Sequence, residues 1–389
     1  MNGVLLARTN RLQSAAFSAG IAGLLACGIG AFVNTRQFFI SYLFAVLFWL
    51  GLSLGCLCVA MIHHLTGGRW GDVSRRFMEA GYMTLPVMGI LFLPLFAGLR
   101  QIYEWAGQDG VAHIPALAFK AHYLNATGFA IRAVVFFAVW IWMASSLRKW
   151  SRQQDETTDV APTQRARSLS GPGVIIYALT VTFAWIDWLM SLEPDWYSTM
   201  AAIIICAGQI LATFALVILM LSWFRNQSPF AEVVEEGQFH QLGNFLLTFV
   251  MFWTYVCFGQ LLIIWSGNLP KEIGWYLHRV AGGWNWVATF LALFNFFLPF
   301  FLLLFRASKK KPQALRVLAG VVFVCQLINS WWLVEPSFFK TGLHIHWMDF
   351  AAPVGIGGMW LAAFAWQLKR APLLAQNDPR ISYAFAHAE

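Results

Sequence analysis

Charged residues are scarce in this sequence. Only 11% of its 389 residues are charged, whereas a soluble domain carries about 25%. Hydrophobic residues make up 59% of the chain, and the mean hydropathy is +0.61. We therefore expect a protein with a lipid-facing surface. The net charge of +8 does not indicate nucleic-acid binding, because the basic residues lie in loops that flank apolar segments.

The sequence patterns that bind metals and haem are also missing. All six cysteines lie in apolar segments, and neither CxxC nor CxxCH occurs, so we expect small core residues rather than a disulfide framework, zinc site, iron–sulfur cluster or c-type haem. The nine histidines lie in loops or at segment ends, which argues against a buried bis-histidine haem. His344, His346 and Asp349 have no further ligands nearby, so no metal is expected.

Ten apolar segments are long enough to cross a bilayer, since about twenty residues suffice. They predict an all-α integral membrane protein in which residues 1–389 form a single polytopic domain. Pro86 and Pro94 interrupt the third segment, and Pro299 lies in the eighth. The predicted spans are 12–33, 38–62, 76–97, 123–147, 171–192, 199–224, 240–265, 283–306, 313–334 and 350–369.

Lys and Arg are distributed unevenly between the two sets of loops. Nineteen of the 26 lie at the end that carries both termini, six lie at the other end, and Arg132 lies inside a span. This bias predicts that both termini are cytoplasmic. The longest polar stretch, residues 151–170, is predicted to be a mobile cytoplasmic connector.

Two spans end alike. Asp187 is followed after five residues by Glu193-Pro194, and Asn329 is followed after five residues by Glu335-Pro336. This echo predicts two parallel four-helix bundles, 38–192 (spans two to five) and 199–334 (spans six to nine), with spans 12–33 and 350–369 peripheral. Chance resemblance between two short Glu-Pro ends is the alternative.

Polar residues inside apolar spans are costly and therefore mark candidate functional sites. Arg132 is expected near the middle of span 123–147, and Glu193, Asp195, Glu335 and Asp349 are expected along the outer surface. Groups at the inner end, the middle and the outer end of one bundle fit a proton pathway. Its candidate residues are His63, His64, Glu79, Arg132, Asp187, Glu193 and Asp195.

Simpler interpretations stand beside this one. The two histidines could be solvated near the interface, and Glu79 could be an acid in the first turn of a helix. An Arg132–Asp187 pair could hold Asp187 ionised or act only as a packing clamp between helices. Glu193 could simply mark a helix end before proline.

Several motifs resemble those of a known family. They are His63-His64-Leu-Thr-Gly-Gly-x-Trp70, the run from Asp187 to Thr199, Trp332-x-x-Glu335-Pro336, and His346-x-x-Asp349 followed by a glycine-rich stretch to Trp360. In this order they resemble the second quinone-binding subunit of bacterial alternative complex III, which has the fold of the polysulfide-reductase membrane subunit.

The resemblance implies a multi-pass subunit of a bacterial inner-membrane complex that oxidises menaquinol or another quinol and passes electrons to cytochrome c. Haem and iron–sulfur clusters would belong to partners: c-type cytochrome subunits, an iron–sulfur subunit and a membrane subunit related to this chain. The chain itself would guide protons, and His64 or Glu79 could take a proton from quinol. The alternatives are a secondary transporter that binds an anion at Arg132 and a purely structural scaffold subunit.

Overall fold

The computed structural model describes residues 3–107, 119–375 and 377, and this part of the chain is helical and contains no β-strand. Ten helical segments are long and apolar enough to cross a membrane, which confirms the predicted number. They are Gly3–Val33, Thr35–Thr66, Arg69–Ala97, Ala126–Glu156, Ala161–Leu192, Ala201–Phe224, Glu236–Gly267, Trp284–Leu304, Pro312–Ser337 and Met348–Leu368. The cytoplasmic placement of the termini stays a prediction, and residues 1–2 and 378–389 lie outside the described residues.

Several of these segments are built from shorter helices. The elements are α1 (Gly3–Val33), α2 (Thr35–Thr66), α3 (Arg69–Tyr82), α4 (Leu85–Phe92), α5 (Pro94–Ala97), α6 (Leu99–Ile102), η1 (Glu104–Ala106), α9 (Ala126–Glu156), α10 (Ala161–Trp188), η2 (Met190–Leu192), α11 (Ala201–Phe224), α12 (Phe230–Val233), α13 (Glu236–Gly267), α14 (Pro270–Val280), α15 (Trp284–Leu291), η3 (Ala292–Phe297), α16 (Leu298–Leu304), α17 (Arg306–Lys310), α18 (Pro312–Val334), η4 (Glu335–Ser337) and α19 (Met348–Leu368). The third span is interrupted near Pro86 and Pro94 as expected, because proline cannot donate the helical hydrogen bond.

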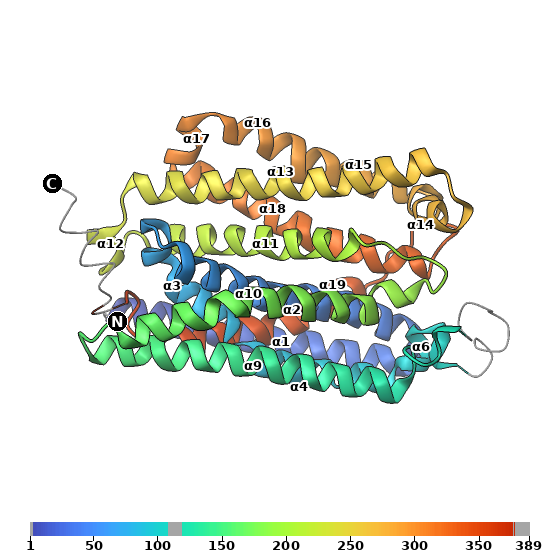
Figure 1. Cartoon of the computed structure of the whole chain (residues 1–389), viewed down its shortest axis with the longest axis horizontal. Coiled ribbons are helices and arrows are strands. Elements are labelled where there is room, and N and C mark those ends of the chain that lie inside the picture. Colours follow the sequence, from blue (N-terminus) through green and yellow to red (C-terminus); the bar gives the residue numbers. More distant parts are fainter. Residues whose placement is uncertain (1–2, 108–118, 376, 378–389) are drawn as a thin grey trace.

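The long helices run side by side, and their connections gather at the two ends of the molecule (Figure 1). One end carries α12 and the start of α1, and the other carries α6 and α14. We call these the α12 end and the α14 end. If the charge bias sets the orientation, the α12 end faces the cytoplasm.

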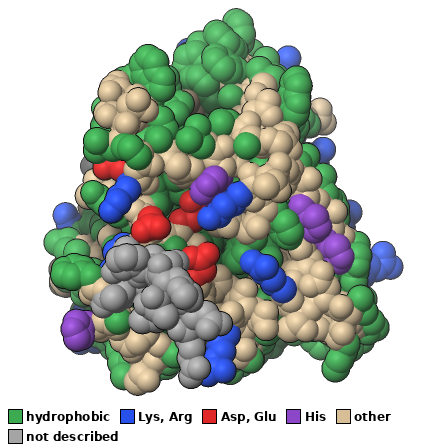
Figure 2. All heavy atoms as spheres, turned by 90° about the vertical axis from the view of Figure 1, so that its right-hand side faces the viewer, with side chains coloured by type: hydrophobic (Ala, Val, Ile, Leu, Met, Phe, Trp, Pro, Cys, Tyr) green, Lys and Arg blue, Asp and Glu red, His purple; other side chains and the backbone are tan. Residues whose placement is uncertain are grey.

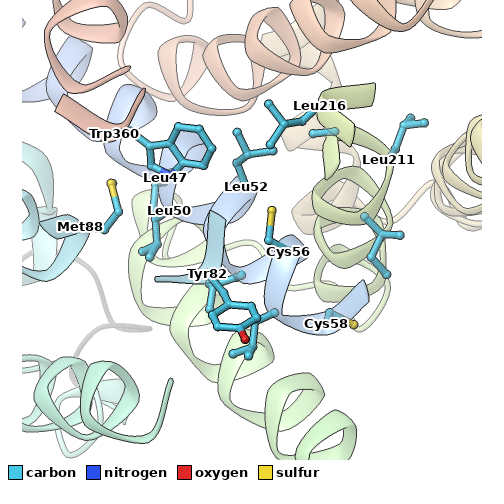
Figure 3. Close-up of a cluster of buried hydrophobic side chains, with 14 of the residues drawn as sticks. Leu47, Leu50, Leu52, Cys56, Cys58, Tyr82, Met88, Leu211, Leu216 and Trp360 are labelled. Carbon is cyan, nitrogen blue, oxygen red and sulfur yellow. The ribbon is translucent and has the colours of Figure 1, made fainter. Parts of the chain in front are cut away.

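Helix α2 lies at the centre of the molecule. Its sequence from Phe39 to Met61 is almost wholly apolar and almost wholly buried, because α3, α10, α11, α18 and α19 all contact it. Cys56 and Cys58 serve there as small core residues, 0% and 3% exposed. Figure 3 shows Leu47, Leu50 and Leu52 of α2 with side chains of the neighbouring helices, among them Tyr82, Leu211, Leu216 and Trp360.

Helices on each side of α2 contact one another. On one side α9 contacts α10 and α4, and on the other α11 contacts α13 and α18. Helix α2 touches both groups, so the division into bundles 38–192 and 199–334 stays a prediction. Helix α1 packs on α19, which in turn packs on α2 and α3.

The prediction of a mobile connector over 151–170 is wrong. Helix α9 continues to Glu156 and α10 begins at Ala161, so only a short turn separates them. The Gln154 side chain closes this turn by donating to the carbonyls of Thr157 and Asp159 and accepting from Thr163. Polar residues here extend two helices because their side chains find partners within the fold.

Helix α1 approaches α19 closely through glycines. A Cβ atom on Gly23 would lie 2.6 Å from the backbone of Gly355, and one on Gly358 would lie closer still to the backbone nitrogen of Gly20. Small residues let membrane helices pack backbone to backbone, where dispersion attraction is strongest. The contact therefore depends on the absence of side chains at these positions.

We expect Gly23→Leu to separate α1 from α19 and to destabilise the protein by about 2 kcal/mol, a typical cost of overpacking. The matched control is Gly28→Leu, because a Cβ at Gly28 meets nothing within 4 Å. Thermal unfolding in detergent measures both variants. Equal melting temperatures for the two variants would contradict this account of the contact.

Candidate functional site

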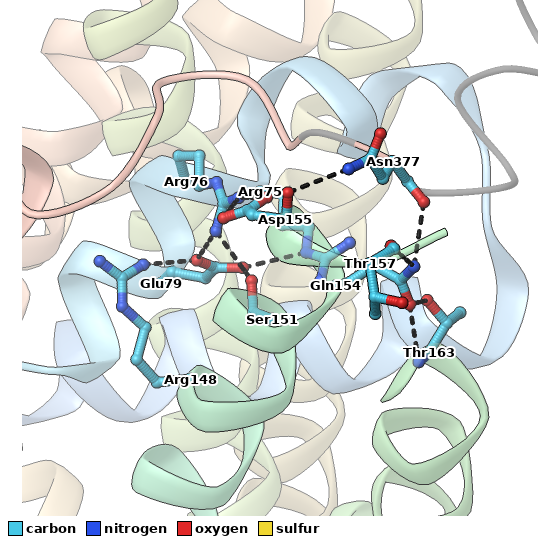
Figure 4. A network of polar contacts seen from close by, with 10 residues as sticks. All are labelled: Arg75, Arg76, Glu79, Arg148, Ser151, Gln154, Asp155, Thr157, Thr163 and Asn377. Carbon is cyan, nitrogen blue, oxygen red and sulfur yellow. Dashed lines mark hydrogen bonds and ion pairs between the residues drawn. The ribbon is translucent and has the colours of Figure 1, made fainter. Parts of the chain in front are cut away.

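Glu79 lies in a cluster of charged residues toward the α12 end (Figure 4). Its carboxylate accepts hydrogen bonds from Arg75 at 2.9 Å, from Arg76 at 2.7 Å, and from Arg148 and Ser151. Arg76 also donates to both oxygens of Asp155. The side chain of Glu79 is 1% exposed, and Arg148 further donates to the carbonyl of Gln367 on α19.

This cluster fills the acceptor capacity of Glu79. An ionised carboxylate offers about four lone-pair positions, and Glu79 has four donors. Binding a proton there would require one of these contacts to break. Arg148, Ser151 and Asp155 all come from α9, so the cluster also ties α3 to α9.

The two candidate histidines are buried at the end of α2, at 2% and 3% exposure. Nε2 of His63 lies 3.2 Å from the carbonyl oxygen of Gly68 and 3.7 Å from Asp72, and its ring contacts Trp70. The interpretation of solvated interfacial histidines is therefore wrong. The ring of His63 is tightly packed, since a Cβ at Gly71 would collide with it.

Arg132 and Asp187 form a bidentate ion pair between α9 and α10. Nε of Arg132 lies 2.7 Å from Oδ2 of Asp187, and Nη2 lies 3.1 Å from Oδ1. The Asp187 side chain is fully buried, whereas Arg132 is 21% exposed. The ring of Tyr123 covers the guanidinium at 3.9 Å. The pair thus joins an enclosed carboxylate to a guanidinium that reaches the surface.

The expected position of Arg132 in the middle of a span is wrong. Helix α9 begins at Ala126 and ends at Glu156, so Arg132 lies in its second turn, toward the α14 end. The predicted span, 123–147, was too short because the polar residues 148–156 were not counted as helix. Asp187 occupies the next-to-last position of α10, at the same end.

Glu193 lies in a second ionic cluster at the α14 end. It accepts hydrogen bonds from Arg279 and Ser337, both at 2.8 Å, and lies 3.2 Å from Nδ1 of His278. Burial alone would raise the pKa of Glu193, but the neighbouring Arg279 outweighs it and, with Ser337 and His278, holds the pKa below its ordinary value. Arg279 is 1% exposed and stacks on Trp275 at 3.7 Å.

Figure 2 shows acidic, basic and histidine side chains gathered on the face at the α14 end. Of the four acids expected along the outer surface, only Asp195 is exposed. Glu193, Glu335 and Asp349 are 9%, 0% and 8% exposed, so for these three the expectation is wrong. They are enclosed because the turns after α10 and α18 pack on α14 and on each other, and because Glu335 faces Asp349.

A large apolar cavity lies between α10, α11, α13, α14, α15 and α18. Its volume is about 970 Å³, and among the described residues that line it none is charged. Trp196 and Trp253 line it and are more than nine-tenths buried, yet neither indole N–H has an acceptor among the described residues. The cavity therefore offers apolar walls with a few unused donors.

A smaller cavity of about 50 Å³ adjoins this one and shares Asn329 with it. Gln209 and Gln326 line the smaller cavity, and Nε2 of Gln209 is another buried donor without a partner in the described part of the chain. Together the two spaces form an apolar cavity that opens to the surface beside Tyr255 and Phe258 and has a polar recess.

No protein-family model and no curated protein sequence matches the chain. The resemblance to alternative complex III therefore rests on the quoted motifs alone. Sequence reasoning also missed Arg148, Asp155 and Arg279, because their partners lie far away along the chain. It missed the cavity entirely, since a cavity is a result of packing.

The Arg132–Asp187 pair gives a direct test by double mutation. Each of the single variants Arg132→Gln and Asp187→Asn should lower the free energy of unfolding by about 2 kcal/mol, because each leaves a buried donor or acceptor without its partner. The double variant should lose less than the sum of the two. Denaturant unfolding in detergent measures the difference, and strict additivity would show that the pair is not coupled.

Proposed function

We propose that the chain is a membrane subunit of a bacterial inner-membrane complex that oxidises quinol and reduces a cytochrome c, and that it guides protons through spans two to five. The assignment to such a complex rests on the motif resemblance. It requires partner subunits that carry the haem and the iron–sulfur clusters. The proton role rests on the buried carboxylate of Asp187 and on the fixed charge of Glu79 in the same group of helices.

The observation that carries the proton role is the placement of these two acids in one group of helices. Glu79 lies on α3 and binds Arg148 of α9, and Asp187 lies on α10 and binds Arg132 of α9. The two arginines are sixteen residues apart, or about 24 Å along the helix. The two acids thus lie toward opposite ends of α9, the helix that carries both of their arginine partners.

The two acids differ in how readily they could exchange a proton. Glu79 has four donors and serves best as a fixed charge, whereas Asp187 has one guanidinium partner that itself reaches the surface. The hydroxyl of Tyr82, buried beside the Glu79 cluster, has no partner among the described residues. From this cluster, waters would have to bridge the remaining distance to Asp187.

Proton movement in vesicles that contain the assembled complex tests this role. In Asp187→Asn we expect quinol oxidation to continue while electron-linked proton movement falls to the background leak, since asparagine cannot carry a proton. Glu104→Gln is the matched control, because Glu104 is exposed at the same end. Retention of partner subunits shows that assembly survives.

Unchanged proton movement in assembled Asp187→Asn would remove Asp187 from the pathway. Loss of assembly with both acid-neutralising variants, Glu79→Gln and Asp187→Asn, would favour the scaffold alternative. Purification of the chain without haem- and cluster-bearing partners would favour the transporter alternative.

The cavity favours a second role, the binding of quinone. Its volume lies within the range of about 300–1,000 Å³ typical of ligand pockets, and its uncharged lining suits a neutral ligand with a long apolar tail. The unused indole donors of Trp196 and Trp253 match the carbonyl oxygens of a quinone. A phospholipid fits less well, because its phosphate would have no cation to bind among the described lining residues.

Filling the cavity tests this role. Ala202 lines it and is 8% exposed, so Ala202→Phe should reduce the quinone that co-purifies with the complex. Ala22→Phe is the control, since Ala22 is exposed on α1, away from the cavity. Extraction and mass spectrometry measure the quinone, and equal content in the two variants would contradict the assignment.

A further inference from the structure

Glu335 is an unusual buried acid. It begins η4, directly after α18, and is 0% exposed. Neither of its carboxylate oxygens has a hydrogen-bond partner among the described residues. An ionised carboxylate there would have lost its hydration without gaining a hydrogen bond. That is among the costliest arrangements in a protein interior.

Asp349 is the acid that faces Glu335, and the amide of Gln37 is beside them. Asp349 itself is well supplied with donors. Ser41 and Gln37 donate to Oδ1, and the backbone N–H of His346 donates to Oδ2 at 2.8 Å. Three of its roughly four acceptor positions are therefore filled, and one remains.

We propose that Glu335 holds a proton at neutral pH and donates it to Asp349, so that the two acids form a buried site for one shared proton at the junction of α2, η4 and α19. One proton balances the donors and acceptors, because it turns an acid without donors into a donor for the one vacant acceptor position. Two adjacent carboxylates could not both ionise here without a cation.

Comparison with Glu193 supports this assignment. Glu193 and Glu335 hold equivalent positions in the sequence echo, each followed by proline. Glu193 faces a buried guanidinium and accepts its hydrogen bonds, whereas Glu335 faces another acid. The same position thus carries a charge in one half of the chain and a proton in the other.

The site does not depend on the proposed function, because it follows from burial and hydrogen bonding alone. It also lies apart from the Arg132–Asp187 pair, on helices α2 and α19. Its two hydroxyl and amide groups, Ser41 and Gln37, come from the central helix. Any exchange of the shared proton would therefore change the hydrogen bonds that these two side chains of α2 make with Asp349.

Infrared spectroscopy of the purified full-length protein tests the proposal. The C=O stretch of a protonated carboxyl group is separate from that of a carboxylate. We expect the wild type to show this band at neutral pH, Glu335→Gln to lack it, and the exposed-acid control Glu104→Gln to keep it. Glutamine is neutral and nearly isosteric, so Glu335→Gln should also keep the melting temperature of the wild type.

Asp349→Asn provides a second, independent variant if Glu335→Gln folds poorly. The band should remain in Asp349→Asn but shift in frequency, because the acceptor of the proton has changed. Absence of the band from the wild type, or its persistence in Glu335→Gln, would overturn the proposal. So would a melting temperature that rises with NaCl in the wild type but not in Glu335→Gln, since that result indicates a bound cation.

Discussion

Each charge enclosed in this apolar molecule needs a partner, and that need shapes the structure. Glu79 gathers three arginines from two helices, Asp187 takes Arg132, and Glu193 takes Arg279. These contacts join α3 to α9, α9 to α10, and the turn after α10 to α14. At these places the loss of one partner would leave a buried charge uncompensated.

The need for partners also explains why the two ends of the molecule differ. Toward the α12 end, three arginines surround Glu79, so the negative charge of this carboxylate is fixed. At the α14 end three buried acids have different environments: a guanidinium for Asp187, a guanidinium with histidine and serine for Glu193, and another acid for Glu335. Because their surroundings differ, these acids differ in how readily they hold a proton.

The number of spans could be predicted because length and hydropathy are local properties of the chain. The candidate acids could be found as well, since a carboxylate in an apolar run is visible without any structure. The surroundings of these acids could not be predicted. Arg148 and Arg279 looked like loop or helix-end cations, and residues 151–156 looked like a connector, because their partners become neighbours only on folding. The cavity that Trp253 lines has no sequence signal, since six helices together define it.

The central claim is that the helices around Arg132 and Asp187 carry protons within a larger redox complex. A density map of the intact assembly, at a resolution that shows ordered water, tests it most directly. The account predicts partner subunits with haem and iron–sulfur clusters, and a line of waters between Tyr82 and Asp187. A chain without such partners, with dry aromatic packing between those two residues, would contradict it.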